Sequence, residues 1–202
     1  MRLHLRRSLA LAVFSLVLCG LVYPLAGTGL SQALFPHQAS GSLGPDGSEL
    51  IGQDWSSPRW FHGRPDDAGP YATDLKASPF VLGGDNPLRA NGVAGTSGPT
   101  NLGPRSKALL ADTKALVAYW HRMGVEPTPD LVTTSGSGLD PDIAPADALA
   151  QVPMVARARG LSPARLRRLV ASQVRPAQLG FLGSDHINVL SLDQALARMD
   201  GR

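Results

Sequence analysis

The most apolar stretch of the chain lies near its N-terminus, where residues 9–35 contain no Asp, Glu, Lys or Arg. About 20 apolar residues in a helix cross a bilayer core of roughly 30 Å, so we predict one transmembrane helix at residues 8–35. A cleaved signal peptide, favoured by the Ser-Gln-Ala sequence at 31–33, has a shorter apolar core of roughly 7–15 residues. A lipoprotein signal ending at Cys19 requires a small residue where Leu18 stands. We therefore favour an uncleaved anchor.

The arginines are placed unevenly about this run and orient it in the membrane. Arg2, Arg6 and Arg7 precede it, and the next Lys or Arg along the chain is Arg59. Because the positively charged flank of a transmembrane helix stays in the cytoplasm, we expect the N-terminus inside and the remainder outside. The predicted parts are a cytoplasmic N-terminus (1–7), a transmembrane helix (8–35) and an extracytoplasmic, periplasmic domain (36–202).

Small residues in the predicted span favour contact with other membrane helices. Gly20, Gly27 and Gly29 lack side chains, which lets a neighbouring helix approach closely. Pro24 lacks an N–H and is expected to kink the helix. Gly and Pro are also common in membrane helices generally, so a plain anchor is the alternative interpretation.

Helical periodicity returns only in the second half of the chain, where apolar residues recur every three or four positions. Ser162 followed by proline marks a helix start, and Gly124 and Gly160 mark helix ends. Pro153 should bend or break the helix that contains it. The predicted helices are Ser106–Met123, Pro145–Arg159, one opening at Ser162 and a short one from Ser191, and the predicted strands are 48–53 and 131–134. These elements indicate a small α+β domain.

Two glycine-rich segments lack this periodicity. Residues 61–104 are rich in Gly and Pro, which at such a length is typical of a functional or partner-ordered loop. Residues 178–183 are expected to return the chain to the core, with Phe181 and Leu182 buried.

Charge and composition exclude several classes of partner. The formal net charge of +3 comes from the three N-terminal arginines, because the other sixteen Lys and Arg balance sixteen Asp and Glu. The outer domain is therefore neutral, and no nucleic-acid partner is expected. The basic stretch from Arg157 to Arg175 is interpreted as a solvated helix face. The histidines form no i, i+4 pair and Cys19 is the single cysteine, so we predict no metal site and no disulfide.

The loop of residues 135–138 is the most site-like segment of the chain. Its glycines expose backbone N–H groups that can bind an anion, although the lysine of a phosphate-binding loop is missing. Ser135 or Ser137 could instead be the nucleophile of a membrane-anchored extracytoplasmic serine hydrolase, with His62 or His186 and an aspartate. The third interpretation is a tight turn that leads to the next helix.

Several sequence blocks occur in an order that resembles one family, the C subunit of the bacterial Kdp-type potassium-transporting ATPase. The resemblance extends over almost the whole chain, and the number and spacing of the blocks carry it. The blocks are Tyr23-Pro24-Leu25, Thr28-Gly29, residues 35–43, Leu50-Ile51-Gly52-Gln53, residues 61–65, Asn101-Leu102-Gly103-Pro104, residues 130–133, residues 135–140, residues 155–161 and Asn188-Val189-Leu190. Residues 74–96 and Met154 depart from the family pattern.

The resemblance implies a non-catalytic accessory subunit of a high-affinity, ATP-driven potassium uptake pump in the bacterial inner membrane. Its partners would be a potassium-channel-like subunit and a P-type ATPase subunit, which it helps to assemble. The complex, rather than this chain, would handle ATP and potassium, so no cofactor is expected here.

The family is also described as a catalytic chaperone that raises the ATP affinity of the ATPase subunit. The candidates for nucleotide contact are then Ser135, Gly136, Ser137, Gly138 and Gln151. The charge asymmetry places these residues outside the cytoplasm, where ATP is scarce, so direct nucleotide binding stays an open question.

Overall fold

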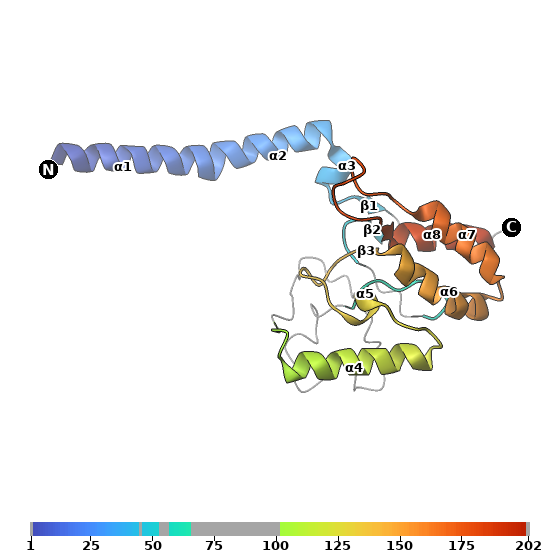
Figure 1. Cartoon of the computed structure of the whole chain (residues 1–202). Coiled ribbons are helices and arrows are strands. Elements are labelled where there is room, and N and C mark those ends of the chain that lie inside the picture. The colour runs from blue at the N-terminus through green and yellow to red at the C-terminus, as the bar shows by residue number, and fades with distance from the viewer. Residues whose placement is uncertain (1, 45, 53–56, 66–101, 201–202) are drawn as a thin grey trace. The chain divides into compact units, whose positions relative to one another are not determined.

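The computed structural model describes residues 2–44, 46–52, 57–65 and 102–200 (Figure 1). The chain divides into two compact units, Met1–Leu43 and Gly44–Arg202. Only the two ends of the predicted loop 61–104 are described, and its segment 74–96 lies outside the described residues.

The first unit consists largely of continuous helical structure, in which α1 (Arg2–Val17), η1 (Leu18–Val22) and α2 (Tyr23–Leu34) precede the short helix α3 (Pro36–Ala39). The 31 residues His4–Leu34 are long and apolar enough to cross a membrane, and none of their most apolar stretch is buried. The predicted apolar helix is therefore present. Its helical structure begins earlier than predicted, at Arg2.

The helix accommodates Pro24 through a π-helical turn. The Tyr23 N–H donates to the carbonyl of Leu18, five residues earlier. In a regular α-helix a proline ring collides with the carbonyl four residues before it, here Gly20, and a wider turn accommodates that conflict. The irregularity predicted around Pro24 thus takes the form of η1, and helical structure continues on both sides of it.

The glycines of this helix present open surface. A Cβ atom added at Gly27 or Gly29 would meet no atom within 4 Å, and one at Gly20 would meet only the Leu16 side chain at 3.8 Å. These glycines and Pro24 are all exposed. Among the described residues, none fills the space beside Gly27 and Gly29.

The described part of the second unit combines helices with very short strands. The helices are α4 (Lys107–Arg122), α5 (Pro129–Val132), α6 (Pro145–Arg159), α7 (Pro163–Gln173) and α8 (Val189–Asp200). One two-stranded sheet pairs β1 (Leu43–Gly44) with β2 (Gly47–Ser48), and the other pairs β3 (Asp142–Ile143) antiparallel to β4 (Ile187–Asn188). Helix α7 packs against α6 and α8. An apolar N-terminal helix followed by a mixed helix–strand region is thereby confirmed.

Local capping rules place the helix ends correctly. Ser106 Oγ accepts a hydrogen bond from the Leu109 N–H at 3.4 Å, and Ser162 Oγ accepts one from the Arg165 N–H at 3.3 Å. Gly160 ends α6 with φ +66°, a left-handed conformation that favours glycine. Helix α6 continues through Pro153, where a bend or a break was predicted, so the helix does not break there. Pro153 lies on the exposed side of the helix, where water can satisfy the carbonyl that loses its partner.

Two predicted strands are wrong, and one predicted helix is present but begins two residues earlier than predicted. No strand forms at 131–134: residues 131 and 132 end the short helix α5, which Pro129 opens and whose Leu131 is buried, and residues 133 and 134 lie in the loop after it. The predicted strand 48–53 reduces to β2 followed by turns, with position 53 outside the described residues. Helix α8 begins at Val189 rather than Ser191, because the Asn188 side-chain oxygen accepts from the Ser191 N–H and caps the helix earlier.

The core of the second unit forms around Trp120, which is fully buried. Its indole N–H donates to the Leu131 carbonyl at 2.8 Å, and its ring lies 5.5 Å from that of His62 and 5.6 Å from that of Tyr119. Phe61 and His62 are also fully buried, so the start of the predicted loop 61–104 is part of the core. The prediction that Phe181 and Leu182 are buried is wrong, since they are 74% and 50% exposed.

Candidate functional site

The serine hydroxyls of the predicted Ser135–Gly138 loop close a tight turn. The Gly138 N–H donates to Ser135 Oγ at 2.9 Å, and the Leu139 N–H donates to Ser137 Oγ at 3.1 Å. The two hydroxyl oxygens lie 3.2 Å apart. These two backbone N–H groups are therefore occupied by side chains of the loop itself. No Cβ contact restricts Gly136, which faces open space.

Gln151, the fifth nucleotide candidate, is fully buried and does not join this loop by any contact of its amide. Its Oε1 accepts from the His62 N–H at 2.8 Å, and its Nε2 donates to the His62 carbonyl at 2.9 Å. Both ends of the amide are thus used by one backbone position that lies 89 residues earlier. A nucleotide contact by Gln151 would require this pair to open.

The carboxylate of Asp193 on α8 binds the backbone of Phe61, the residue before His62. Its Oδ1 accepts from the Phe61 N–H at 3.0 Å, and its Oδ2 is buried without a hydrogen-bond partner in the part of the chain that the structure describes. Burial raises the pKa of Asp193 well above its ordinary value, against smaller lowering effects of the Phe61 N–H and the Arg159 charge. Together Gln151 and Asp193 fasten the 57–65 segment to α6 and α8.

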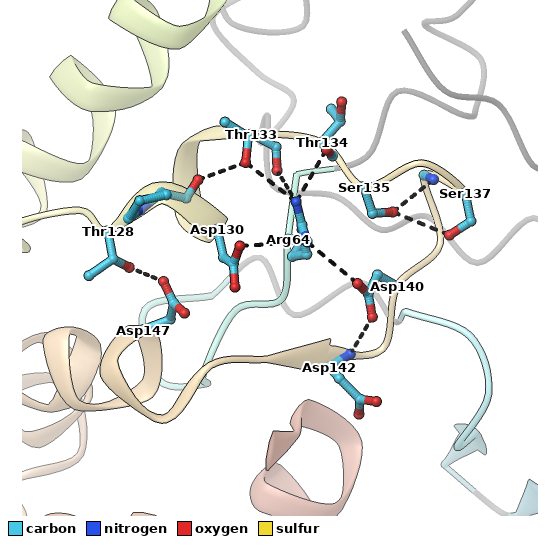
Figure 2. A network of polar contacts seen from close by, with 12 residues as sticks. Arg64, Thr128, Asp130, Thr133, Thr134, Ser135, Ser137, Asp140, Asp142 and Asp147 are labelled. Carbon is cyan, nitrogen blue, oxygen red and sulfur yellow. Dashed lines mark hydrogen bonds and ion pairs between the residues drawn. The ribbon is translucent and has the colours of Figure 1, made fainter. Parts of the chain in front are cut away.

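Arg64 joins the same segment to the loop that follows α5 (Figure 2). Its Nη1 lies 3.5 Å from a carboxylate oxygen of Asp130 and 3.6 Å from one of Asp140. Its Nη2 donates to the carbonyls of Thr133 and Thr134 at 3.5 and 3.3 Å. Because one guanidinium contacts Asp130 of α5 and three residues of the loop after it, Arg64 fixes how this loop lies against the domain.

A cleft of about 620 Å³ opens beside Arg64. Asp140 accepts from the Asp142 N–H at 3.0 Å, and both carboxylates line the cleft. The opposite wall comes from the segment that precedes β4. The lining residues are Arg64, Asp130, Asp140, Asp142, Ile143, Ala144, Gln178, Leu182, Gly183, Ser184, Asp185 and His186.

Asp147 on α6 lies close to this network (Figure 2). It is almost fully buried, and its carboxylate accepts a hydrogen bond from the Thr128 hydroxyl. Burial, and secondly the negative charge of Asp130, raise the pKa of Asp147 to about 6. Asp147 therefore exchanges a proton at a pH where an ordinary aspartate is ionised.

The predicted hydrolase residues are not assembled around Ser135. Within the described residues, the hydrogen bonds of the Ser135 hydroxyl go to Ser137 and Gly138. His62 is buried, with Nε2 3.0 Å from the Ser57 carbonyl, and His186 lines the cleft with Nδ1 3.1 Å from the Ser184 carbonyl. This arrangement gives Ser135 no general base. Over the described ranges, no group of three or more His, Cys, Asp or Glu side chains could hold a metal ion.

Arg64 and Asp193 organise the polar contacts of the domain and were not predicted. The available signal for Arg64 was a cation near the start of the Gly/Pro-rich segment 61–104, together with the acids at 130 and 140. Their proximity depends on tertiary structure, because 66 to 76 residues separate them along the chain. Asp193 gave no signal, since an aspartate near a helix start is usually exposed.

Within the described residues, one N-terminal helix long and apolar enough to span a membrane precedes a small mixed helix–strand unit, which supports the class of membrane-anchored proteins. The family model of KdpC, the c chain of K⁺-transporting ATPases, matches residues 5–198. The chain therefore belongs to the KdpC family.

Full-length relatives agree with this assignment. The chain is 47% identical to the potassium-transporting ATPase KdpC subunit of Methylobacterium nodulans, over 98% of each chain. It is 43% identical to the KdpC subunit of Caulobacter vibrioides, over 96% of this chain and 92% of the relative, and 44% identical to that of Sorangium cellulosum, over 96% of each. Membership of this family implies an accessory role in potassium uptake, beside other subunits of the ATPase.

Proposed function

We propose that the chain is a non-catalytic subunit that assembles and stabilises the channel-like and ATP-hydrolysing subunits of a potassium pump. The observation that carries this proposal is the 31-residue apolar helix His4–Leu34, none of whose most apolar stretch is buried by the chain itself. In a membrane this surface meets lipid and neighbouring helices. The open space beside Gly27 and Gly29 suits a neighbouring helix, because side-chain bulk is missing there.

The N-terminus lies in the cytoplasm and the second unit in the periplasm of the inner membrane. The support is the charge asymmetry, with Arg2, Arg6 and Arg7 before the uncharged run 9–35 and no Lys or Arg between that run and Arg59. In this orientation the second unit caps the potassium entrance of the channel-like subunit. By binding one assembled state more tightly than the others, the chain shifts the population of the pump toward that state without any chemistry of its own.

A catalytic chaperone effect on ATP affinity would then act through assembly rather than through direct nucleotide contact. One support is that both ends of the Gln151 amide are hydrogen-bonded to the His62 backbone. The other is that the Ser135 and Ser137 hydroxyls accept hydrogen bonds from backbone N–H groups of their own turn. Coupling between the external domain and the nucleotide site would pass through the packed transmembrane helices.

Removal of residues 44–202, with the helical anchor kept, is expected to reduce potassium uptake to the background level of cells that lack the chain. The measurement is uptake at limiting external potassium in cells that produce the other subunits. The control is the full chain at an equal membrane level, measured by immunoblot. Full uptake by the anchor alone would refute the proposed role of the periplasmic domain.

A further inference from the structure

The segment between α7 and β4 forms a small hairpin with an exposed apolar tip. Leu179, Phe181 and Leu182 are 82%, 74% and 50% exposed, and none of them belongs to the core cluster of the second unit. The nine residues 176–184 contain no Asp, Glu, Lys or Arg. Three large apolar side chains side by side on one loop are unusual on a surface that faces only water.

The hairpin is held in one shape by its backbone. Arg175 and His186 exchange N–H···O=C bonds of 2.8 and 3.0 Å, and Gln178 and Leu182 exchange two of 2.9 Å. Asp185 accepts from the Ala177 N–H at 3.1 Å. A rigid tip loses little conformational freedom when it binds, so its apolar side chains are preorganised for contact.

The turn of the hairpin keeps a leucine in a conformation that favours glycine. Leu179 has φ +55°, which is uncommon for a residue with a branched side chain. The neighbouring Gly180 has φ +79° and needs no side chain. A leucine at this strained and 82% exposed position is explained by a contact that its side chain makes outside the chain.

The hairpin is continuous with the acidic cleft beside Arg64. Gln178, Leu182 and Asp185 of the hairpin segment form one wall of that cleft. Four carboxylates line the cleft against the single guanidinium of Arg64, so the surface beside the apolar tip is negatively charged. Loops that enter a bilayer surface are flanked by several Lys and Arg, which anionic lipids attract. Here one arginine, Arg175 at the hairpin base, stands against the four carboxylates of the cleft, and its Nη2 donates to the Ser191 hydroxyl at 3.2 Å. The charge pattern therefore favours a protein partner with positive charge.

We propose that the hairpin 177–184 and the adjacent acidic cleft together form the docking surface for another subunit of the pump. That subunit offers an apolar recess to Leu179 and Phe181 and a Lys or Arg side chain to the cleft. This inference rests on the proposed function, because it names the surface through which the periplasmic domain engages its complex. The rigid apolar residues are the anchors of the contact, and the cleft fixes its orientation.

Photo-crosslinking from the tip tests the inference directly. The full chain carrying Phe181→p-benzoylphenylalanine is produced together with the other subunits, and its membranes are irradiated. The control carries the same group at Leu110 of α4, which is 56% exposed and lies outside the hairpin. We expect an adduct with another subunit from position 181 and none from position 110. An adduct with lipid alone would overturn the protein partner in favour of the bilayer.

A second measurement separates this inference from the function on which it rests. The double variant Leu179→Ser/Phe181→Ser is expected to weaken recovery of the other subunits by about tenfold, as loss of two apolar anchors predicts. The control Leu110→Ser should recover them as the parent chain does. Full recovery with the double variant would overturn the docking surface and leave the assembly role intact. If the parent chain recovered no other subunit, the result would overturn both the docking surface and the assembly role.

Discussion

Gln151→Ala is expected to destabilise the second unit by about 2–5 kcal/mol, because it removes both hydrogen bonds between the buried amide and the His62 backbone. Each unpaired buried donor or acceptor costs about 1–3 kcal/mol, and the truncated side chain adds a cavity. The 57–65 segment should then open more often, since Gln151 is one of the residues that fasten it to the domain. Urea unfolding of the full chain in detergent micelles measures the loss, and hydrogen exchange at 57–65 locates it.

The matched control is Gln178→Ala, because Gln178 is exposed and pairs with Leu182 through its backbone. Its effect should stay within about 0.5 kcal/mol. The experiment also separates packing from nucleotide contact. Unchanged stability of Gln151→Ala, together with a lower ATP affinity of the assembled pump, would contradict the packing account and favour the nucleotide role.

Asp147→Asn is expected to remove a pH dependence of stability between about pH 4 and pH 6. The folded state binds a proton at Asp147 with a pKa of about 6, whereas the unfolded state has the ordinary value of 3.8. Between these values the folded state is protonated and the unfolded state is ionised. Stability therefore falls as the pH rises, by up to about 3 kcal/mol, and levels off above the folded pKa.

The asparagine variant keeps the acceptor for the Thr128 hydroxyl but never ionises, so it should be more stable than the parent at pH 7.5 and similar to it near pH 4. Urea unfolding across this pH range measures the difference between the two chains. The exposed Glu49 provides the control Glu49→Gln, which should leave the profile of the parent unchanged. If the parent chain became more stable from pH 4 to pH 6 and Asp147→Asn removed that rise, the result would contradict the raised pKa of Asp147.

Features set by neighbouring residues could be predicted from the sequence. The serine cap at 162 and the glycine after α6 depend on a few adjacent backbone groups, and both occur as predicted. The long uncharged run likewise determines the N-terminal helix by itself. Family membership was predicted from the order of short blocks and is confirmed over residues 5–198.

Features that depend on distant residues were missed or wrong. Residues 131–134 have the composition of a strand, but Pro129 and burial of Leu131 against Trp120 make a helical turn instead. Phe181 is apolar and was expected inside, but the hairpin holds it outside. The role of Gln151 could not be read from its neighbours, since its partner is 89 residues away.

The central claim is that the chain is a stoichiometric subunit of a potassium pump, and affinity purification through a C-terminal tag tests it most directly. Membranes of potassium-starved cells are solubilised in mild detergent, and the co-purifying proteins are identified by mass spectrometry. We predict recovery of a channel-like subunit and a P-type ATPase subunit in amounts equal to the tagged chain. Purification of the chain alone, from cells shown to contain both other subunits, would contradict the claim.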